Sequence, residues 1–316
     1  MWYEIFKFEL KYRAKRADTY IYFALLFCYA LIAVDFIFNE NLNPIKRNAP
    51  YIIAKVTGII AALFTMVTSM IMGVAVLRDF DHNMAPLLFV NPIKKSDYLL
   101  GRFLGSFAVL VFIFSSVPIG LILGDFMPWR ASADLLPFNV WRYIQPFFTV
   151  VLPNLFFTGA IFFVAGAWSR KLLVVYTQGI ILLMCYIFTL QMAQGSDDPF
   201  LAALIDPFAY QTINVAVELW TPIMRNNQMV EMESVLFYNR LIWVAVGGAI
   251  LVIGYWRFSF NIVRNSWFNS IKKEDFIEEK RLPFLLLIFR WLIFNRGVSP
   301  NLFSLNTIPY FTFGLF

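Results

Sequence analysis

Long apolar segments alternate with short polar ones along most of the chain. Backbone groups inside hydrocarbon must be hydrogen-bonded internally, so apolar segments of about the ~20 residues that cross a bilayer predict helices rather than barrel strands. Six segments qualify: residues 19–38, 51–77, 99–123, 146–168, 172–194 and 236–256. The pattern therefore predicts an all-α protein, a polytopic membrane helix bundle with six transmembrane helices.

The polar segments divide the chain further. Residues 1–18 predict an N-terminal cytoplasmic interfacial helix, residues 19–262 a six-span membrane domain, and residues 263–316 a basic cytoplasmic tail that is either irregular or truncated. Within the membrane domain, residues 78–98 form the first cytoplasmic loop. Residues 195–235 form a large outer loop whose many apolar positions predict short helices.

The interfacial helix is amphipathic, but imperfectly. One stripe is polar and another face is apolar; the stripe contains Glu4, Lys7, Lys11 and Lys15, and the face contains Trp2, Phe6 and Leu10. Glu9, Arg13 and Arg16 interrupt the apolar side. We therefore expect part of that side to contact protein or lipid headgroups.

Composition supports a membrane protein. Of the 316 residues, 60% are hydrophobic and only 15% are charged, whereas soluble domains hold roughly 45–50% apolar residues. The net charge of +6 comes mostly from basic residues beside the apolar segments, which argues against nucleic-acid binding. Seventeen of these residues lie on the side of the N-terminus and seven on the other, so the positive-inside rule predicts that both termini are cytoplasmic.

Catalytic motifs are missing from the sequence. No Gly-Lys pair is present, so the chain has no phosphate-binding loop of the ATPase type, and His82 is its only histidine, which excludes an H-E-x-x-H zinc site and a Ser/His/Asp triad. Cys28 and Cys185 lie in apolar segments and are expected to be small buried residues. We expect no enzyme activity, no cofactor and no metal site.

Polar and small residues inside the spans leave two interpretations open. Thr65, Thr68 and Ser69 in the second span, with Gly159 and Gly166 in the fourth, either pack helices together or line an interface that opens for a substrate. Asp35, near the outer end of the first span, is expected to be a helix-end carboxylate, and the sequence assigns it no further role.

Two stretches carry a family resemblance. LRDFDHNMAPLLFVNPIKKSDYLLGRFLGSF (77–107) joins the second and third spans, and DPFAYQTINVAVELWTP (206–222) is followed by YNRLIWVAVGGAILVIGYWRFSF (238–260). With the six-span layout, they resemble the permease of ABC-2 type transporters, in particular the variant sometimes fused to an M1-type aminopeptidase. The chain carries no H-E-x-x-H motif, so no peptidase activity is expected.

The resemblance implies a function and partners. The chain would be the membrane-spanning permease subunit of an ATP-binding-cassette transporter, a multi-pass protein of the bacterial cytoplasmic (inner) membrane surrounded by membrane lipids. It would form the translocation path, pair with a second permease unit as a homo- or heterodimer, and couple to separate cytoplasmic ABC ATPase subunits. The alternatives are a non-transporting membrane scaffold or anchor, or the truncated membrane half of a permease–aminopeptidase fusion.

The first cytoplasmic loop is the expected ATPase-coupling site. An apolar centre with a charged rim is typical of a docking surface, and the resemblance implies the same role for this loop. The site residues are Asp79, Asp81, His82, Leu87, Leu88, Phe89, Pro92, Lys94, Lys95 and Asp97. A solvated loop whose lysines only obey the positive-inside rule is the alternative.

Overall fold

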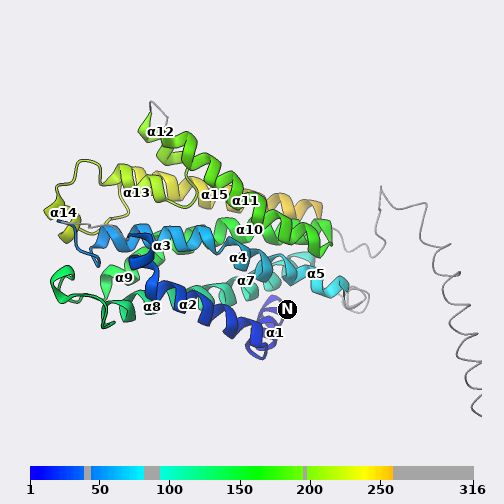
Figure 1. Cartoon of the computed structure of the whole chain (residues 1–316). Helices are drawn as coiled ribbons and strands as arrows, with labels where there is room; N and C mark the ends of the chain where they lie inside the picture. Colours follow the sequence, from blue (N-terminus) through cyan, green and yellow to red (C-terminus); the bar gives the residue numbers. More distant parts are fainter. Residues whose placement is uncertain (39–43, 82–92, 195–197, 259–316) are drawn as a thin grey trace, which may run out of the picture. The chain divides into compact units, whose positions relative to one another are not determined.

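The computed structural model describes residues 1–38, 44–81, 93–194 and 198–258. Within these ranges every regular element is a helix, which confirms the all-helical prediction (Figure 1). The tail expected over residues 263–316 lies outside the described residues.

Five helical stretches of the described chain are long and apolar enough to cross a membrane, and one bent pair makes a sixth. The five are α2 (Ala17–Ile37), α7 (Lys95–Phe114) with α8 (Ser116–Asp125), α9 (Trp141–Pro146) with the π-helical turn Phe147–Val151 and α10 (Leu152–Ser169), α11 (Leu172–Gln194), and α15 (Ser234–Arg257). The six predicted apolar segments correspond to these stretches and to the bent pair. The chain is a polytopic membrane protein.

The second span is not the single helix that the sequence predicts. It comprises α3 (Pro50–Leu63), α4 (Thr65–Met72) and α5 (Val74–Asp81), and its two halves bend by 51° at Phe64. A second interruption falls at Gly73, where α10 approaches closely. A Cβ atom on Gly166 of α10 would overlap the Gly73 carbonyl oxygen, so only glycine allows this contact between the two backbones.

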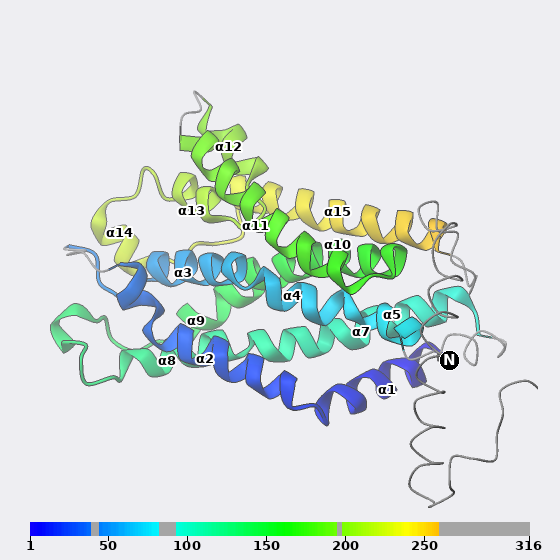
Figure 2. The same ribbon diagram turned by 45° about the vertical axis from the view of Figure 1, so that its right-hand side comes forward.

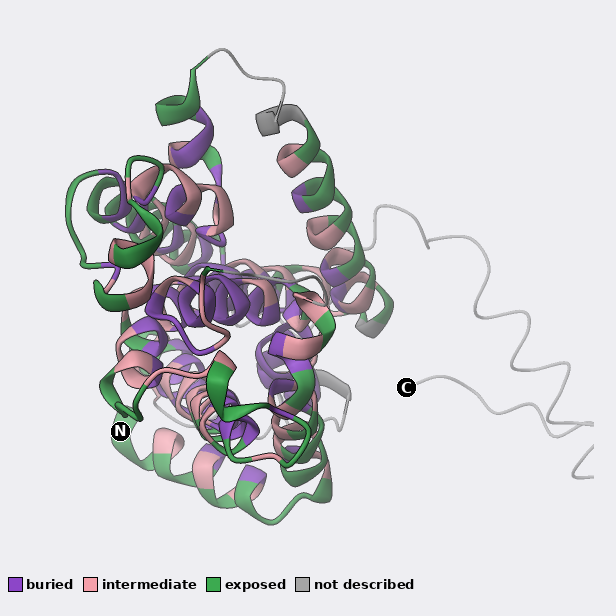
Figure 3. Cartoon of the chain, turned by 60° about the vertical axis from the view of Figure 1, so that its left-hand side comes forward, coloured by how far each residue is buried: buried purple, intermediate pink, exposed green. Residues whose placement is uncertain are grey.

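The small residues of the fourth span therefore pack helices together, which is the first of the two interpretations that the sequence leaves open. Gly166 lies against the backbone of Gly73, and a Cβ atom on Gly159 would contact the Met72 side chain at 3.4 Å. Helix α10 contacts α4, α7, α11 and α15, and 67% of the most apolar part of its span is buried, compared with 17% for α11. Figure 3 shows that the buried residues gather on the inner faces of the helices. Whether this interface opens for a substrate stays a prediction.

The outer segment contains the short helices that the sequence predicts: α12 (Pro199–Ile205), α13 (Tyr210–Ala216) and α14 (Pro222–Asn227). Buried polar side chains of α15 bond to α12, to the turn that follows α12, and to α10. The Asn239 Nδ2 group donates to the carbonyl oxygens of Ala203 at 2.6 Å and Asp206 at 2.8 Å, and Arg240 Nη1 donates to Asn154 Oδ1 at 2.6 Å. Burial raises the pKa of the Asp206 carboxyl, although backbone N–H groups donate to it.

The N-terminal helix α1 (Trp2–Ala14) packs along the first turns of α7 (Figure 2). Gly101 and Gly105 make this close approach possible, since a Cβ atom on Gly105 would lie 2.6 Å from the Glu9 Cβ atom. The three lysines of the predicted stripe are exposed. Of the three residues that interrupt the apolar side, Glu9 and Arg13 are buried against protein, whereas Arg16 is exposed.

Two expectations are corrected. Cys28 on α2 and Cys185 on α11 are exposed on the isolated chain rather than buried, because both helices lie at the edge of the bundle. The loop expected over residues 78–98 is also shorter than predicted, since α5 continues to Asp81 and α7 begins at Lys95.

Candidate functional site

Five charged side chains from three helices meet beside the ends of α5 and α7. Arg102 of α7 joins two carboxylates: its Nη1 atom lies 2.5 Å from Glu9 Oε2, and its Nη2 atom lies 2.6 Å from Asp79 Oδ1. Arg78 of α5 and Arg13 of α1 complete the group at 2.6 Å and 3.2 Å from the Glu9 carboxylate. We call these five residues the charge cluster.

Local sequence spacing positions each member. Glu9 and Arg13 are four residues apart and so lie on one face of α1, which Gly101 and Gly105 admit against α7. Tyr98 and Arg102 share a face of α7 in the same way, and the Tyr98 hydroxyl donates to Asp79 Oδ2 at 2.7 Å. The cluster therefore connects α1, α5 and α7 through side chains that lie far apart in the sequence.

Burial makes these interactions strong. Glu9 is fully buried at 0% exposure, and the other four members are at most 7% exposed. Burial alone raises the pKa of the Glu9 carboxyl, but Arg78 and Arg102, followed by Arg13, outweigh it and hold the pKa below its ordinary value. Removing one partner from such a buried group typically costs about 3–5 kcal/mol, because the remaining charges lose their compensation.

Hydrogen bonds and aromatic rings enclose the cations. Arg13 Nη2 donates to the Ile71 carbonyl oxygen at 3.0 Å, which ties α1 to α4 as well. The Arg78 guanidinium lies 4.0 Å from the centre of the Tyr12 ring, and the Arg102 guanidinium lies 5.5 Å from that of Phe8. With three arginines and two carboxylates, the cluster carries one excess positive charge.

The structure divides the predicted coupling residues. Asp79 belongs to the buried cluster at 3% exposure, so it does not contribute to an exposed charged rim. Asp81 is the last residue of α5, Lys94 is the exposed residue that precedes α7, and Lys95 and Asp97 lie in the first turn of α7. The remaining predicted residues, His82, Leu87, Leu88, Phe89 and Pro92, lie outside the described residues.

Sequence reasoning missed four members of the cluster as site residues: Glu9, Arg13, Arg78 and Arg102. Arg78 and Arg102 enter the sequence analysis only as membrane-orientation signals. One signal was available, because Glu9 and Arg13 interrupt an otherwise apolar helix side, and such an interruption indicates a protein contact.

A second polar group lies at the opposite end of the bundle (Figure 2). Asp35, at the end of α2, accepts from Arg47 at 3.0 Å and from Arg130 at 2.9 Å, and Arg130 also contacts Asp125 at 2.7 Å. The Tyr143 hydroxyl donates to the same Asp125 carboxylate. Asp35 is thus a helix-end carboxylate, as expected, and it joins the connections that follow α2 and α8.

Known proteins add no identification. No family model matches the chain, and no curated protein matches it. Within the described ranges, no group of three or more His, Cys, Asp or Glu residues could hold a metal ion. The structure therefore supports a polytopic membrane protein in which buried ion pairs join the N-terminal helix to the ends of the second and third spans.

Proposed function

We propose that the chain is the membrane-spanning permease subunit of an ABC-2 type transporter, which forms the translocation path and couples to a separate cytoplasmic ATPase. In this proposal the six spans leave both termini in the cytoplasm, and α1 lies along the inner membrane surface. Two such chains, or one chain and a sister permease, complete the path. The sequence resemblance is the starting point of the proposal.

The charge cluster is the observation that carries the proposal furthest. Residues 82–92, which we call the docking segment, are the part of the expected coupling loop (78–98) that lies outside the described residues, and they are bounded by α5 and α7. Both bounding helices are held to α1 by buried ion pairs, through Arg78 on one side and Arg102 on the other. A displacement of the segment by a partner would therefore move α1 and the second and third spans together.

The breaks in the second span support the same mechanism. A straight helix transmits a push along its axis, whereas the second span bends by 51° at one defined point, Phe64. Force applied at Asp79 would reach Gly73, which touches Gly166 near the end of α10. The break at Phe64 lies beyond this contact, so the part of the span from Thr65 to Asp79 would carry a displacement from the proposed coupling site to α10.

The experiment replaces two apolar residues of the docking segment. Leu87→Asp combined with Leu88→Asp should abolish co-purification of ATPase activity with the tagged chain, because an interface that buries two new carboxylates is strongly disfavoured. Leu219→Asp with Ile223→Asp is the matched control, since these residues are 94% and 73% exposed in the outer segment. ATP hydrolysis and mass spectrometry of the purified complex give the readout.

Two results would contradict the proposal. If no ATPase co-purifies with the unchanged chain, the protein is a membrane scaffold rather than a permease subunit. If the Leu87/Leu88 variant is inserted normally and retains its ATPase, the segment is a solvated loop and not the docking surface.

A further inference from the structure

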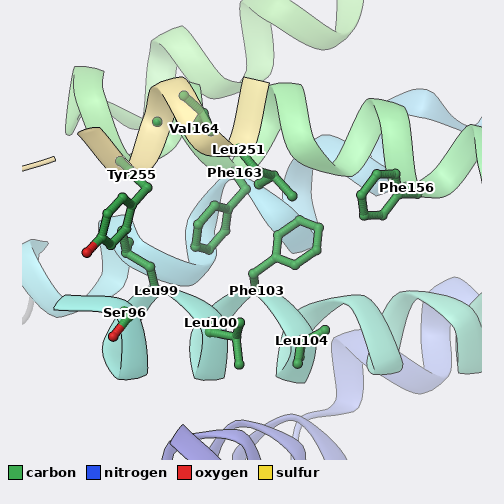
Figure 4. Close-up of a pocket in the computed structure, with 12 residues that line it drawn as sticks. Ser96, Leu99, Leu100, Phe103, Leu104, Phe156, Phe163, Val164, Leu251 and Tyr255 are labelled. Atoms are coloured by element: carbon green, nitrogen blue, oxygen red, sulfur yellow. The ribbon is translucent and has the colours of Figure 1, made fainter. Parts of the chain in front are cut away.

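An apolar groove lies between α7, α10 and α15, outside the charge cluster (Figure 4). Its volume is about 330 Å³, within the range of ligand sites. Phe103 of α7, Phe163 of α10 and Leu251 of α15 point into it. Among the described lining residues, only Ser96 and Tyr255 carry a polar side-chain group, and both lie at one end.

The length of the groove matches half of a bilayer. On α7 it extends from Ser96 to Leu104, which at 1.5 Å per residue is about 12 Å. On α10 it extends from Phe156 to Ala167, about 16 Å by the same rule. One leaflet of hydrocarbon is about 15 Å thick, so the groove spans one leaflet.

The polar end of the groove is cationic. Lys95 Nζ lies 4.7 Å from the Tyr255 ring centre and donates to the Trp256 carbonyl oxygen at 3.4 Å, while Lys94 beside it is exposed. Among the described residues, no side-chain hydrogen bond caps the N-terminus of α7, whose first turn brings Ser96 to this end of the groove; the first N–H groups of a helix are anion donors. Asp97 in the same turn offsets one of the two lysine charges.

We infer that the groove binds one anionic phospholipid. An acyl chain occupies the apolar part, and the phosphate lies between Lys94, Lys95 and the N-terminus of α7. Tyr255 and Trp256 lie at headgroup level, as interfacial aromatic residues do. The inference does not depend on a transport function. If the proposed orientation is right, the bound lipid belongs to the cytoplasmic leaflet.

A second protein chain fits the groove less well than a lipid tail. A partner strand would leave its backbone groups without hydrogen bonds among apolar side chains. The acyl chain of a phospholipid has no such groups, and the negative charge of an anionic headgroup complements the lysines at the open end.

The test measures retained lipid. The purified chain is delipidated, exchanged into nanodiscs of phosphatidylglycerol or phosphatidylcholine, and released for native mass spectrometry. One phosphatidylglycerol per chain should remain bound, and phosphatidylcholine should not. Lys94→Gln with Lys95→Gln should weaken retention about 30-fold, from roughly 1 kcal/mol for each lysine. Lys7→Gln with Lys11→Gln, two exposed lysines of α1, is the matched control and should retain the lipid.

A second variant tests the apolar part separately. Leu251→Trp should fill the groove and prevent retention while leaving both lysines in place, provided that the variant elutes and melts like the unchanged chain. Equal retention of the two lipids, or full retention by the lysine variant, would overturn the headgroup site. Full retention by Leu251→Trp would overturn the groove as the tail site, and so would a disulfide between two copies carrying Leu100→Cys.

Discussion

At the scale of single residues, Glu9 is the shared anion of the charge cluster. It lies in a helix that begins at the N-terminus and is exposed on its opposite side, yet its carboxylate is fully buried and receives three guanidinium groups. A buried carboxylate without these partners would be protonated or strongly destabilising. Its role is therefore inseparable from Arg13, Arg78 and Arg102.

Glu9→Gln should lower the stability of the folded chain by about 3–5 kcal/mol, because three buried arginines lose their shared anion. Glu4→Gln is the control, since Glu4 is exposed on the same helix. Thermal unfolding in detergent, followed by tryptophan fluorescence, measures the difference. An equal melting temperature for the two variants would show that the cluster contributes nothing to stability.

The same residue gives the stability a defined pH dependence. The pKa of Glu9 is lower in the folded chain than its ordinary value, so its contribution is present above the ordinary pKa. It is lost as the pH falls through the lowered, folded-state pKa. Consequently, the difference between the unchanged chain and Glu9→Gln should shrink in acid, and a difference that grows in acid would contradict this assignment.

The sequence identifies the polar members of the cluster as charged residues near membrane ends, but not as a group. Glu9 and Arg102 are separated by 93 positions, and no local spacing predicts that they touch. The positive-inside rule counts every arginine equally, whether its side chain is exposed or paired with a buried carboxylate. Only the approach of α1 to α7 distinguishes Arg78 and Arg102 from the exposed Lys94.

At the scale of elements, hydrophobic length predicts the spans well because each must cross the same hydrocarbon thickness. The break in the second span is not predictable in this way. Phe64 and Gly73 continue an apolar segment, and the interruption at Gly73 depends on contact with Gly166, a residue of another helix. The short helices of the outer segment were predictable, since a long connection that is rich in apolar residues is expected to fold and bury them.

The contact between α1 and α7 provides a test at this scale. Gly105→Leu should displace α1, because even a Cβ atom there would lie 2.6 Å from Glu9 Cβ and 3.3 Å from the Phe6 carbonyl oxygen. Overpacking of this kind costs about 1–3 kcal/mol or more. Limited trypsin digestion should then cleave α1 at its lysines faster than in the unchanged chain.

Gly248→Leu is the matched control for Gly105→Leu. It introduces the same side chain into another membrane span, but a Cβ atom on Gly248 meets nothing within 4 Å. Digestion of this variant should match the unchanged chain. If Gly105→Leu also digests like the unchanged chain, α1 does not depend on the glycine face of α7.

At the scale of the whole molecule, the basic residues separate into two unequal sets. The starts of α1, α7 and α11 and the end of α15 lie at one end of the bundle, and the connection after α8 and helix α14 lie at the other (Figure 2). The seventeen basic residues that the sequence assigns to one side belong to the first end, apart from those outside the described ranges. The positive-inside rule then predicts that this end is cytoplasmic, as the proposed function requires.

Cysteine labelling of intact cells tests this orientation. In a chain with Cys28→Ala and Cys185→Ala, single cysteines at Ser132 and Asn227 should react with an impermeant maleimide, because both positions are exposed at the outer end. Single cysteines at Lys15 and Lys94 should react only after the membrane is permeabilised, since they lie at the opposite end of the bundle and no charged reagent crosses the hydrocarbon. Labelling of Lys15→Cys in intact cells, with Ser132→Cys protected, would invert the molecule and place the charge cluster and the proposed docking segment where no ATP-driven partner can reach them.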